Sequence, residues 1–541
     1  MKPRILMLLL LILIFGSGLR LWQLGKIPEG FYSDEALYGY EAYSLSKTGR
    51  DQFGYEWPIS VAGFGDYRPA AYIWATVPFI KYFGLTEFAT RLPSALASIM
   101  TLILVFYFVW EVTKKPKIAL FATLLLAISP LSLYFGRMAH ETNLMTLFIV
   151  AGCVCLWKCR QKNGYAVPAM LFFAAAVYTY HSARVFVPLF LLLTYWLFRK
   201  TIFQDKRMVV LSLLTLFVFS LPLVNELRNP ESWSRIQGVS LWTDPGLIPR
   251  INEWRGRVSG FGVPVILSRM LVNKVTIFSL SFVNNYLSHF SPDFLLSKGD
   301  PNGVYNTPKS GILYWVDPLL MLIGALVLYK RERRTFWWVG GSILLGLIPD
   351  ALTRVAPASP RIHLVLPFVV LLSGMGMATL GSLKPKAIYY FVSILLVINT
   401  WWFWYQYLLV RPLERSDAWQ TGTKEMVLTA QKLAPRFDQI WISRSGWGWI
   451  HLVFHTRLDP ALWQKQIRIA ERNDMGFWWV RDVGKYHLEW LPKPLNTSLH
   501  TLYIATPSEF ASGIVPMAKI QDPLRHTDIY WLVDSENLAV D

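Results

Sequence analysis

Two adjacent carboxylates, Asp34 and Glu35, stand directly after the first long apolar run of the chain. A carboxylate at a membrane–water boundary costs free energy unless it is paired, hydrated or used in chemistry. Residues 36–47, which follow, carry apolar side chains at helical spacing, so the pair is expected to open an amphipathic helix. The pair therefore predicts the acid–base or metal-binding end of an active site. Asp34 is the favoured functional residue, because it adjoins the apolar run and Glu35 doubles the charge.

Further ionisable side chains that could assist such chemistry fall in short polar segments between apolar runs. They are Asp66 and Arg68, then Arg137, His140 and Glu141, then His181 and Arg184, and finally Asp350, Arg354, Arg361 and His363. Carboxylates can activate a nucleophile, and a guanidinium can hold a phosphate through two parallel hydrogen bonds. If these segments share one side of a membrane, the residues predict a phosphate-handling site at its surface.

Structural explanations compete with the functional one for several of these residues. Arg137 and Glu141 are four positions apart at a helix start and could simply pair with each other. Arg184 and Arg361 fall in the first turns of predicted helices, where the macrodipole disfavours a cation. A bound anion would offset that cost, which favours phosphate binding at these two arginines.

Two weaker signals accompany them. His140 and His181 are better interpreted as hydrogen-bonded boundary residues than as metal ligands. The tripeptide Asn496-Thr497-Ser498 fits a glycosylation acceptor, although the pattern is short.

The composition is that of an integral membrane protein. Of 541 residues, 53% are hydrophobic and only 16% are charged, and the mean hydropathy is +0.34, whereas soluble domains carry roughly 25% charged residues. The net charge of +18 comes from basic residues placed between apolar runs, which indicates membrane topology and argues against nucleic-acid binding. The three cysteines share one apolar segment and are expected to form neither a disulfide nor a metal site.

Eleven apolar runs are long enough to be interpreted as membrane spans. We place them at 5–24, 91–112, 117–134, 142–159, 165–180, 185–199, 208–224, 311–329, 335–350, 363–383 and 387–408. Basic residues occupy every second connection, so the positive-inside rule puts the N-terminus in the cytoplasm and the C-terminal part outside. The first run is expected to be a retained signal anchor of a plasma (inner) membrane protein.

The predicted fold is a polytopic α-helical membrane module followed by a small extracytoplasmic α/β domain. The module spans 1–410 and has two long outer loops, 25–90 and 225–310; residues 70–83 within the first are expected to form a helix along the membrane surface. The domain spans 411–541, with predicted strands at 440–443 and 502–505 and predicted helices at 421–434 and 459–473.

Two stretches of the first outer loop resemble a known family. They are Phe64-Gly65-Asp66-Tyr67-Arg68-Pro69-Ala70-Ala71-Tyr72 and Phe83-Gly84-Leu85-Thr86-Glu87-Phe88-Ala89-Thr90-Arg91-Leu92-Pro93-Ser94. Together with Ser33-Asp34-Glu35 and the turn from Arg137 to Glu141, they resemble the bacterial aminoarabinose transferases and the dolichyl-phosphate-mannose protein mannosyltransferases. These are glycosyltransferases of the GT-C fold. The resemblance covers residues 1–200 well and the later spans only in general layout.

The resemblance implies transfer of a sugar, with inversion, from a polyprenyl-phosphate donor to an acceptor hydroxyl on a protein, lipid or glycan. Asp34 would be the general base with Glu35 as its neighbour, and Arg68 would contact the lipid phosphate, with Arg361 a further candidate. The chain departs from the family pattern where Arg68 replaces a lysine and Ala70 a proline. Some family members bind a divalent metal beside this motif, and no ligand cluster in the sequence requires one here.

Two other functions fit the same sequence less well. A transporter or flippase of lipid-linked sugars would be expected to carry ionisable groups near the middle of its spans, and the charges here avoid those positions. A scaffold whose C-terminal domain binds a partner would leave the acidic pair without a purpose.

Overall fold

The computed structural model describes residues 2–226, 238–446, 448–469, 479–495 and 498–538. These residues divide into two compact units, each formed from separate stretches of the chain. The first contains Met1–Leu19, Ala97–Phe135 and Glu141–Phe403, and the second contains Arg20–Leu96, Gly136–His140 and Trp404–Asp541. The first outer loop thus belongs to the same unit as the C-terminal domain.

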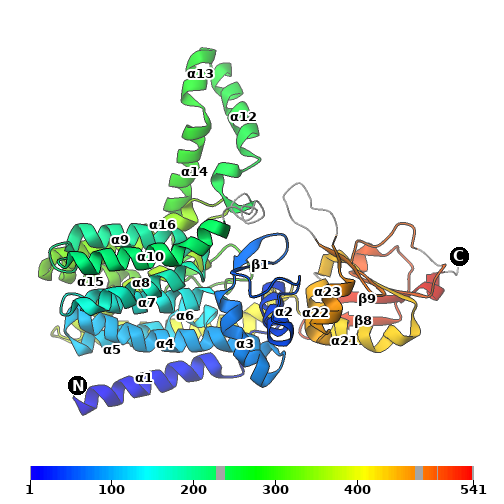
Figure 1. The fold of residues 1–541 in the computed structure, drawn as a ribbon, viewed down its shortest axis with the longest axis horizontal. Helices are drawn as coiled ribbons and strands as arrows, with labels where there is room; N and C mark the ends of the chain where they lie inside the picture. Colours follow the sequence, from blue (N-terminus) through cyan, green and yellow to red (C-terminus); the bar gives the residue numbers. More distant parts are fainter. Residues whose placement is uncertain (1, 227–237, 447, 470–478, 496–497, 539–541) are drawn as a thin grey trace. The chain divides into compact units, whose positions relative to one another are not determined.

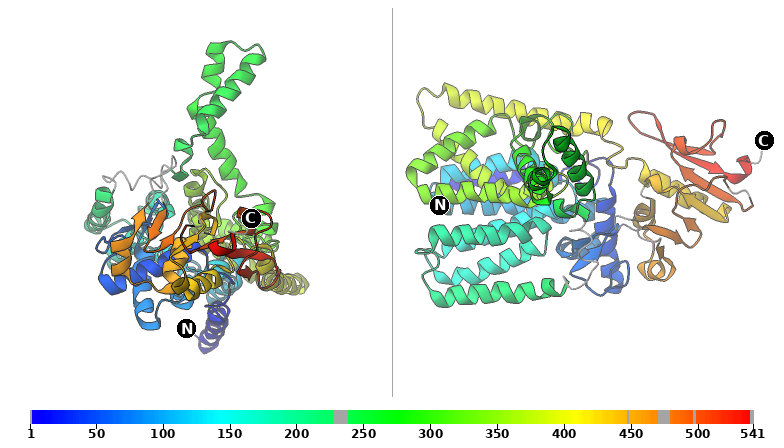
Figure 2. Two further views of the ribbon diagram at one scale, coloured as in Figure 1. Left: turned by 90° about the vertical axis from the view of Figure 1, so that its right-hand side faces the viewer. Right: turned by 90° about the horizontal axis from the view of Figure 1, so that it is seen from above.

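The first unit is a bundle of apolar helices that lie side by side (Figures 1 and 2). Its main members are α5 (Pro116–Ile128), α7 (Thr142–Lys158), α8 (Ala166–Val177), α9 (His181–Phe198), α10 (Lys206–Glu226), α15 (Asp317–Arg331), α16 (Arg333–Ala351), α18 (Leu366–Leu380) and α19 (Ala387–Tyr405). Glycines let α15 and α18 approach closely: a Cβ at Gly324 would lie 1.9 Å from the carbonyl oxygen of Leu372, and one at Gly376 would lie 2.0 Å from that of Leu320. Small residues at such crossings are typical of membrane helix pairs.

Seven of the described helices are long and apolar enough to cross a membrane. Six coincide with predicted spans, among them α1 (Pro3–Leu21) and α4 (Glu87–Thr113). The other predicted spans also form helices, but shorter or less apolar ones; the run 117–134, for example, breaks before Pro130, which cannot donate a backbone hydrogen bond. The chain is therefore a multi-pass helical protein, as predicted.

The seventh such segment, Val265–Ser288, falls inside the stretch predicted to be an outer loop. It comprises α13 (Val265–Leu271) and α14 (Lys274–Ser288). Together with α12 (Leu247–Gly260) it forms an arm that extends away from the other helices of the first unit (Figure 1). Arg269 and Lys274 divide the segment into two shorter apolar runs.

The first outer loop folds as α2 (Ser33–Thr48), a short antiparallel pair of β1 (Ser60–Ala62) and β2 (Tyr67–Pro69), and α3 (Ala71–Phe83). The C-terminal part of the second unit forms a mixed seven-stranded sheet in the order β4-β5-β6-β3-β7-β9-β8. Its strands are β3 (Gln439–Ile442), β4 (Arg468–Ile469), β5 (Val480–Val483), β6 (Tyr486–His487), β7 (Thr501–Ala505), β8 (Ala518–Gln521) and β9 (Asp528–Asp534).

Helices α21 (Thr423–Leu433), α22 (Gly448–Thr456) and α23 (Pro460–Gln466) accompany this sheet. The structure agrees with the strands predicted at 440–443 and 502–505 and with the helix predicted at 421–434. The helix predicted at 459–473 is shorter, because α23 ends at Gln466 and Arg468–Ile469 pairs with β5. Of the glycosylation tripeptide, Asn496 and Thr497 lie outside the described residues.

Helix α2 was expected to be amphipathic, and that expectation is wrong. Nearly all of its residues are buried, because α2 packs against α3 and also against α22 and α23. A Cβ at Gly39 would lie 2.4 Å from the ring of Phe454, and the hydroxyl of Tyr40 donates a hydrogen bond to the carbonyl oxygen of Leu458 at 3.1 Å. Gln464 of α23 also donates a hydrogen bond to the hydroxyl of Ser44 at 3.3 Å, so the C-terminal domain covers polar as well as apolar residues of α2.

Candidate active site

Asp34, Asp66 and Arg68 come together at the start of α2. Arg68 lies on β2, and its Nη1 is 2.8 Å from Oδ1 of Asp34, while its Nε is 3.3 Å from Oδ1 of Asp66. The hydroxyl of Tyr32 donates a hydrogen bond to the other oxygen of Asp34 at 3.3 Å. Register in the β1–β2 pair fixes this approach, since Val61 stands opposite Arg68.

The three side chains of this group are partly open to solvent, at 17% for Asp34, 14% for Asp66 and 12% for Arg68. Burial lowers the pKa of Arg68, but the carboxylates of Asp34 and Asp66 outweigh burial and hold it well above its ordinary value. Arg68 is therefore a permanent cation between two carboxylates. A ligand that carries both an anionic group and a hydroxyl could bind here, with the anionic group on Arg68 and the hydroxyl on a carboxylate.

Glu35 points elsewhere and is fully buried. Its two oxygens accept hydrogen bonds from Nε and Nη2 of Arg91 at 2.9 and 2.8 Å, and one of them also accepts from the backbone N–H of Ala139 at 2.7 Å. Arg91 donates in addition to the carbonyl oxygens of Leu24, Pro28 and Gly30. Glu35 thus anchors the loop before α2 to the start of α4.

Arg137 is buried and has a similar binding pattern. Its Nη2 donates to the carbonyl oxygens of Trp22 at 2.7 Å and Ile27 at 3.1 Å, and its guanidinium lies against the rings of Trp404 and Tyr407. Through these contacts Arg137 holds the segment from Trp22 to Ile27 in place. His140, three residues further on, is also buried.

Sequence reasoning did not single out three other buried arginines of the second unit. They are Arg20, Arg91 and Arg411. Arg411 stacks on the rings of Tyr407 and Trp419. Their position in the sequence was the available signal. Each stands near one end of an apolar run and outside the basic connections. An arginine there is costly unless it has a partner.

In the first unit, Asp350 gathers a second ionisable group. Its Oδ1 is 2.8 Å from Nη1 of Arg361, and its Oδ2 accepts hydrogen bonds from Nε2 of His289 at 2.8 Å and from the backbone N–H of Ala358 at 2.7 Å. Asp350 and His289 are buried, whereas the Arg361 side chain keeps 20% exposure. The carboxylate and the histidine therefore hold Arg361 in a fixed, partly accessible position.

The remaining predicted residues of the first unit serve mainly local contacts. Nδ1 of His363 is 2.8 Å from the hydroxyl of Thr146. Arg354 donates to the carbonyl oxygen of Thr243 at 2.6 Å, and Arg184 to that of Val177 at 3.5 Å. Glu141 precedes α7 and His181 begins α9.

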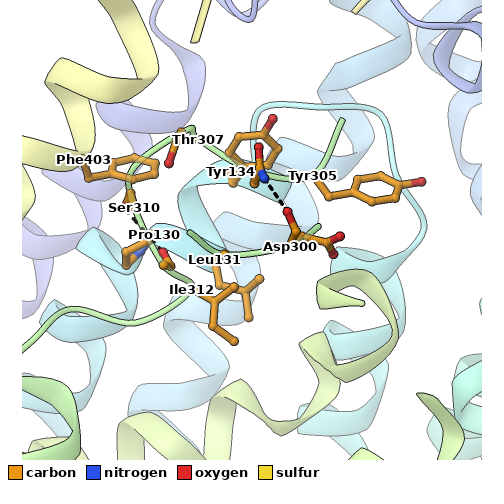
Figure 3. Close-up of a pocket in the computed structure, with 12 residues that line it drawn as sticks. Pro130, Leu131, Tyr134, Asp300, Tyr305, Thr307, Ser310, Ile312 and Phe403 are labelled. Atoms are coloured by element: carbon orange, nitrogen blue, oxygen red, sulfur yellow. Dashed lines mark hydrogen bonds between the residues drawn. The ribbon is translucent and has the colours of Figure 1, made fainter. Parts of the chain in front are cut away.

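A partly buried loop at 299–311 supports the segment that carries Arg361. Asp300 accepts hydrogen bonds from the backbone N–H and the hydroxyl of Ser359, at 2.6 and 2.7 Å. Burial raises the pKa of Asp300 despite these bonds. Figure 3 shows Asp300 and Tyr305 around a cavity of about 20 Å³ that is also lined by Tyr134, room for about one water molecule. The loop is thus a packed support rather than a ligand pocket.

A divalent metal, which the family resemblance allows, would need oxygen or nitrogen ligands that are free to bind it. At the acidic pair, the carboxylates of Asp34 and Asp66 share the guanidinium of Arg68, an arrangement that does not fit a metal site. Among the described residues, three ligand atoms lie within 4.8 Å of one another only at His500, Asp534 and Glu536 of the C-terminal sheet.

Comparison with known proteins gives one family match. Residues 67–224 match the model of the dolichyl-phosphate-mannose-protein mannosyltransferases. No curated protein sequence matches the chain.

Solved structures give matches over nearly the whole chain. ArnT from Cupriavidus metallidurans, in the apo state, is 12% identical with a TM-score of 0.55 and covers 98% of this chain and 97% of its own. The same protein bound to undecaprenyl phosphate matches with the same identity and score over 99% and 98%. The oligosaccharyltransferase AglB from Archaeoglobus fulgidus is 13% identical over 84% of this chain and 64% of its own, with a TM-score of 0.48.

The ArnT matches confirm the fold predicted from the sequence, including a C-terminal domain that contains a sheet. The match over 67–224 begins at Tyr67, the first residue of β2, so it includes Arg68 but not Asp34 or Asp66. The chain accordingly has a fold like that of ArnT, and its residues 67–224 are similar to the dolichyl-phosphate-mannose-protein mannosyltransferases.

Proposed function

We propose that the protein transfers a sugar from a polyprenyl-phosphate donor to an acceptor hydroxyl at the outer face of the plasma membrane, with inversion at the anomeric carbon. The observation that carries the proposal is the ion pair of Asp34 and Arg68. Its carboxylate, the proposed proton acceptor, is 2.8 Å from its guanidinium, the proposed phosphate-binding group, and both side chains are partly open to solvent. The ArnT structure with undecaprenyl phosphate supports a polyprenyl phosphate as the lipid component.

In the proposed reaction, the donor phosphate competes with Asp34 for Arg68. A guanidinium binds phosphate at least as readily as carboxylate, so Arg68 can move to the donor while Asp66 keeps hold of its Nε. Asp34 loses its counter-charge in the process and becomes a stronger base. Donor binding thereby activates the carboxylate that the acceptor needs.

Transfer then proceeds in one displacement. The acceptor hydroxyl gives its proton to Asp34 while its oxygen bonds to the anomeric carbon, and the bond from that carbon to the phosphate oxygen breaks. The electron pair of the broken bond stays on the phosphate, whose growing negative charge Arg68 stabilises. Attack opposite to the leaving phosphate inverts the configuration.

The other predicted residues have supporting roles in this proposal. Glu35 positions Asp34 by fixing the start of α2 through Arg91, and Arg137 fixes the segment that enters it. Arg361, held by Asp350, is a second candidate for phosphate binding. The N-terminus would be cytoplasmic and the C-terminal domain extracytoplasmic, as the alternation of basic connections indicates.

The proposal is tested with the purified full-length protein and a panel of polyprenyl-phosphate sugars. Release of free polyprenyl phosphate, followed by mass spectrometry, is expected for at least one donor and is expected to vanish in Asp34→Asn. Unchanged release in that variant would remove the proposed base. Movement of labelled lipid across vesicles without any donor cleavage would identify a flippase instead.

A further inference from the structure

A pocket of about 280 Å³ lies within the second unit, between the loop that precedes α2 and the loop that precedes α21. The first of these loops is held by Arg91, which donates to the carbonyl oxygens of Pro28 and Gly30. Gly30 has a φ of +82°, and a Cβ there would lie 2.4 Å from the carbonyl oxygen of Trp419. The two loops are therefore packed tightly beside the pocket, and Arg91 ties its wall to Glu35 of the proposed active site.

Charged side chains of both signs line this pocket, which we call the loop pocket. They are Lys26, Glu29, Glu87, Lys424, Glu425 and His455. Lys424 and Glu87 pair at 2.6 Å. In the part of the chain that the structure describes, the carboxylates of Glu29 and Glu425 have neither a hydrogen bond nor an ion pair. Burial raises the pKa of Glu29; the charge of Arg411 opposes this, and the charges of Asp522 and Glu425 add to it.

His455 also lines this pocket, and one of its ring nitrogens is buried. Its Nε2 is shielded from solvent and has no hydrogen-bond partner among the described residues. The ring stacks on His451, whose Nε2 is 2.6 Å from Oε1 of Gln420, another lining residue. Burial and the charge of Lys424 lower the pKa of His455 to about 3, so the imidazole is neutral and can donate or accept. A buried polar nitrogen without a partner is costly, which points to a ligand.

The lining excludes several ligand classes. Glu29 and Glu425 would repel an anion such as phosphate, and Lys26 and Lys424 would repel a cationic peptide. The pocket carboxylates are not among the described groups that offer three metal ligands within 4.8 Å. An apolar lipid chain would displace water from the charged groups and offer them no hydrogen bonds in its place. A hydroxyl-bearing, uncharged ligand suits the site, because each hydroxyl can donate to a carboxylate and accept from a lysine or imidazole.

We propose that the loop pocket binds one sugar ring of the acceptor, which is therefore a glycan. Its volume is just below the usual range for small-ligand pockets, roughly 300–1,000 Å³, and suits one ring rather than a long chain. This inference rests on the proposed transfer reaction and identifies the class of its acceptor. Because Arg91 anchors both the pocket wall and Glu35, a bound acceptor would be held by the same support as Asp34.

The test uses saturation-transfer NMR on the purified full-length protein with the methyl glycosides of glucose, mannose, galactose and N-acetylglucosamine. At least one glycoside should receive saturation. The double variant Glu29→Gln/Glu425→Gln should weaken its binding about tenfold or more, since hydrogen bonds to charged groups are stronger than those to neutral ones. His455→Phe keeps the ring and removes Nε2, and should also weaken binding. Glu253→Gln, an exposed carboxylate on α12, is the matched control and should bind as the wild type does.

Two results would overturn the inference: no saturation of any glycoside, or undiminished binding by both pocket variants. Displacement of the glycoside by trilysine would assign the pocket to a cationic peptide instead. Donor cleavage by a protein that binds no glycoside would overturn the glycan acceptor and leave the transferase standing. Glycoside binding without cleavage of any donor would support the sugar site and contradict the transfer reaction.

Discussion

Glu35 and Arg91, 56 positions apart in the chain, form a two-bond ion pair with distances of 2.9 and 2.8 Å. Both side chains are buried, at 0% and 1% exposure, whereas Asp34 next to Glu35 keeps 17% and pairs with Arg68. Successive residues of a helix are rotated by about 100°, so the acidic pair points in two directions. One carboxylate is part of the protein's framework, and the other, which is partly exposed, is the proposed base.

The framework role predicts that Glu35→Ala is destabilising. Removing one partner of a buried pair leaves the other charge uncompensated and costs about 3–5 kcal/mol. The midpoint of thermal unfolding in detergent, followed by tryptophan fluorescence, should fall markedly. Glu253→Ala removes an exposed partner of Arg257 and should change it little, since exposed pairs contribute about 0–1 kcal/mol. Equal midpoints for the two variants would contradict this role of Glu35.

Asp34→Asn should have the opposite profile. The amide keeps the shape of the side chain but cannot take a proton, so kcat should fall by roughly 10²–10⁴-fold, the usual contribution of a general base. The unfolding midpoint should stay within a degree or two of that of the wild type, because the residue is partly exposed. A variant that loses stability in parallel with activity would show a structural residue instead of a base.

Two variants of Arg68 should separate the contribution of its charge from that of its shape. Arg68→Lys preserves the cation that faces Asp34 and Asp66 but loses the planar fork, and should retain part of the activity. Arg68→Ala removes the phosphate contact and should lower kcat/KM for the donor by roughly 10²–10³-fold, as the loss of a transition-state stabiliser does. Equal kcat/KM for the two variants would argue against phosphate binding by Arg68.

Asp350 should act through Arg361. In Asp350→Asn the guanidinium loses its charged partner, and if Arg361 binds the donor phosphate, KM for the donor should rise several-fold with a smaller change in kcat. His289→Gln keeps a hydrogen-bond donor for Asp350, so its KM for the donor should stay close to that of the wild type. His289→Ala removes that hydrogen bond, and its KM should rise. An effect on kcat alone would show that Arg361 serves the chemical step rather than binding.

The pH dependence of stability should reveal Asp51, whose Oδ1 accepts hydrogen bonds from the N–H groups of Phe53 and Tyr55. Burial raises its pKa from 3.8 to about 6. The folded protein therefore binds this proton more tightly than the unfolded chain does. The contribution is complete below pH 3.8 and is lost as the pH rises through about 6.

Asp51→Asn keeps the acceptor oxygen and removes the titration. The wild type should lose stability relative to this variant between about pH 4 and 6, on the order of 1 kcal/mol. Parallel unfolding curves for the two proteins, measured by denaturant titration over this range, would show that Asp51 titrates normally.

Much of the fold could be predicted from the sequence because membrane spans and short helices leave local signals. The apolar runs, the helix after Asp34 and the strands at 440–443 all follow from periodicity or hydropathy. The approach of Asp66 and Arg68 to Asp34 depends on a two-stranded pairing of three residues each, which composition does not specify. Motif resemblance, rather than pattern, drew attention to Arg68.

Long-range partners were the part that could not be predicted. Nothing near Glu35 in the sequence indicates Arg91, and nothing near Arg361 indicates His289. The helix α2 was misjudged for the same reason, since its polar-looking face is covered by α22 and α23. The sequence shows where a charged residue would be costly to bury. The partner that offsets this free energy is known only from the folded structure.

The packing of α2 against α22 and α23 also sets an order of events during synthesis. Tyr40 and the Leu458 carbonyl that accepts its hydrogen bond are 418 positions apart. At about 5–20 residues per second, the ribosome needs roughly 20–80 s to make the intervening chain. During that time α2 has already left the ribosome, but α22 and α23 have not yet been made. The face of α2 that they cover is therefore buried only after the last quarter of the protein has been synthesised.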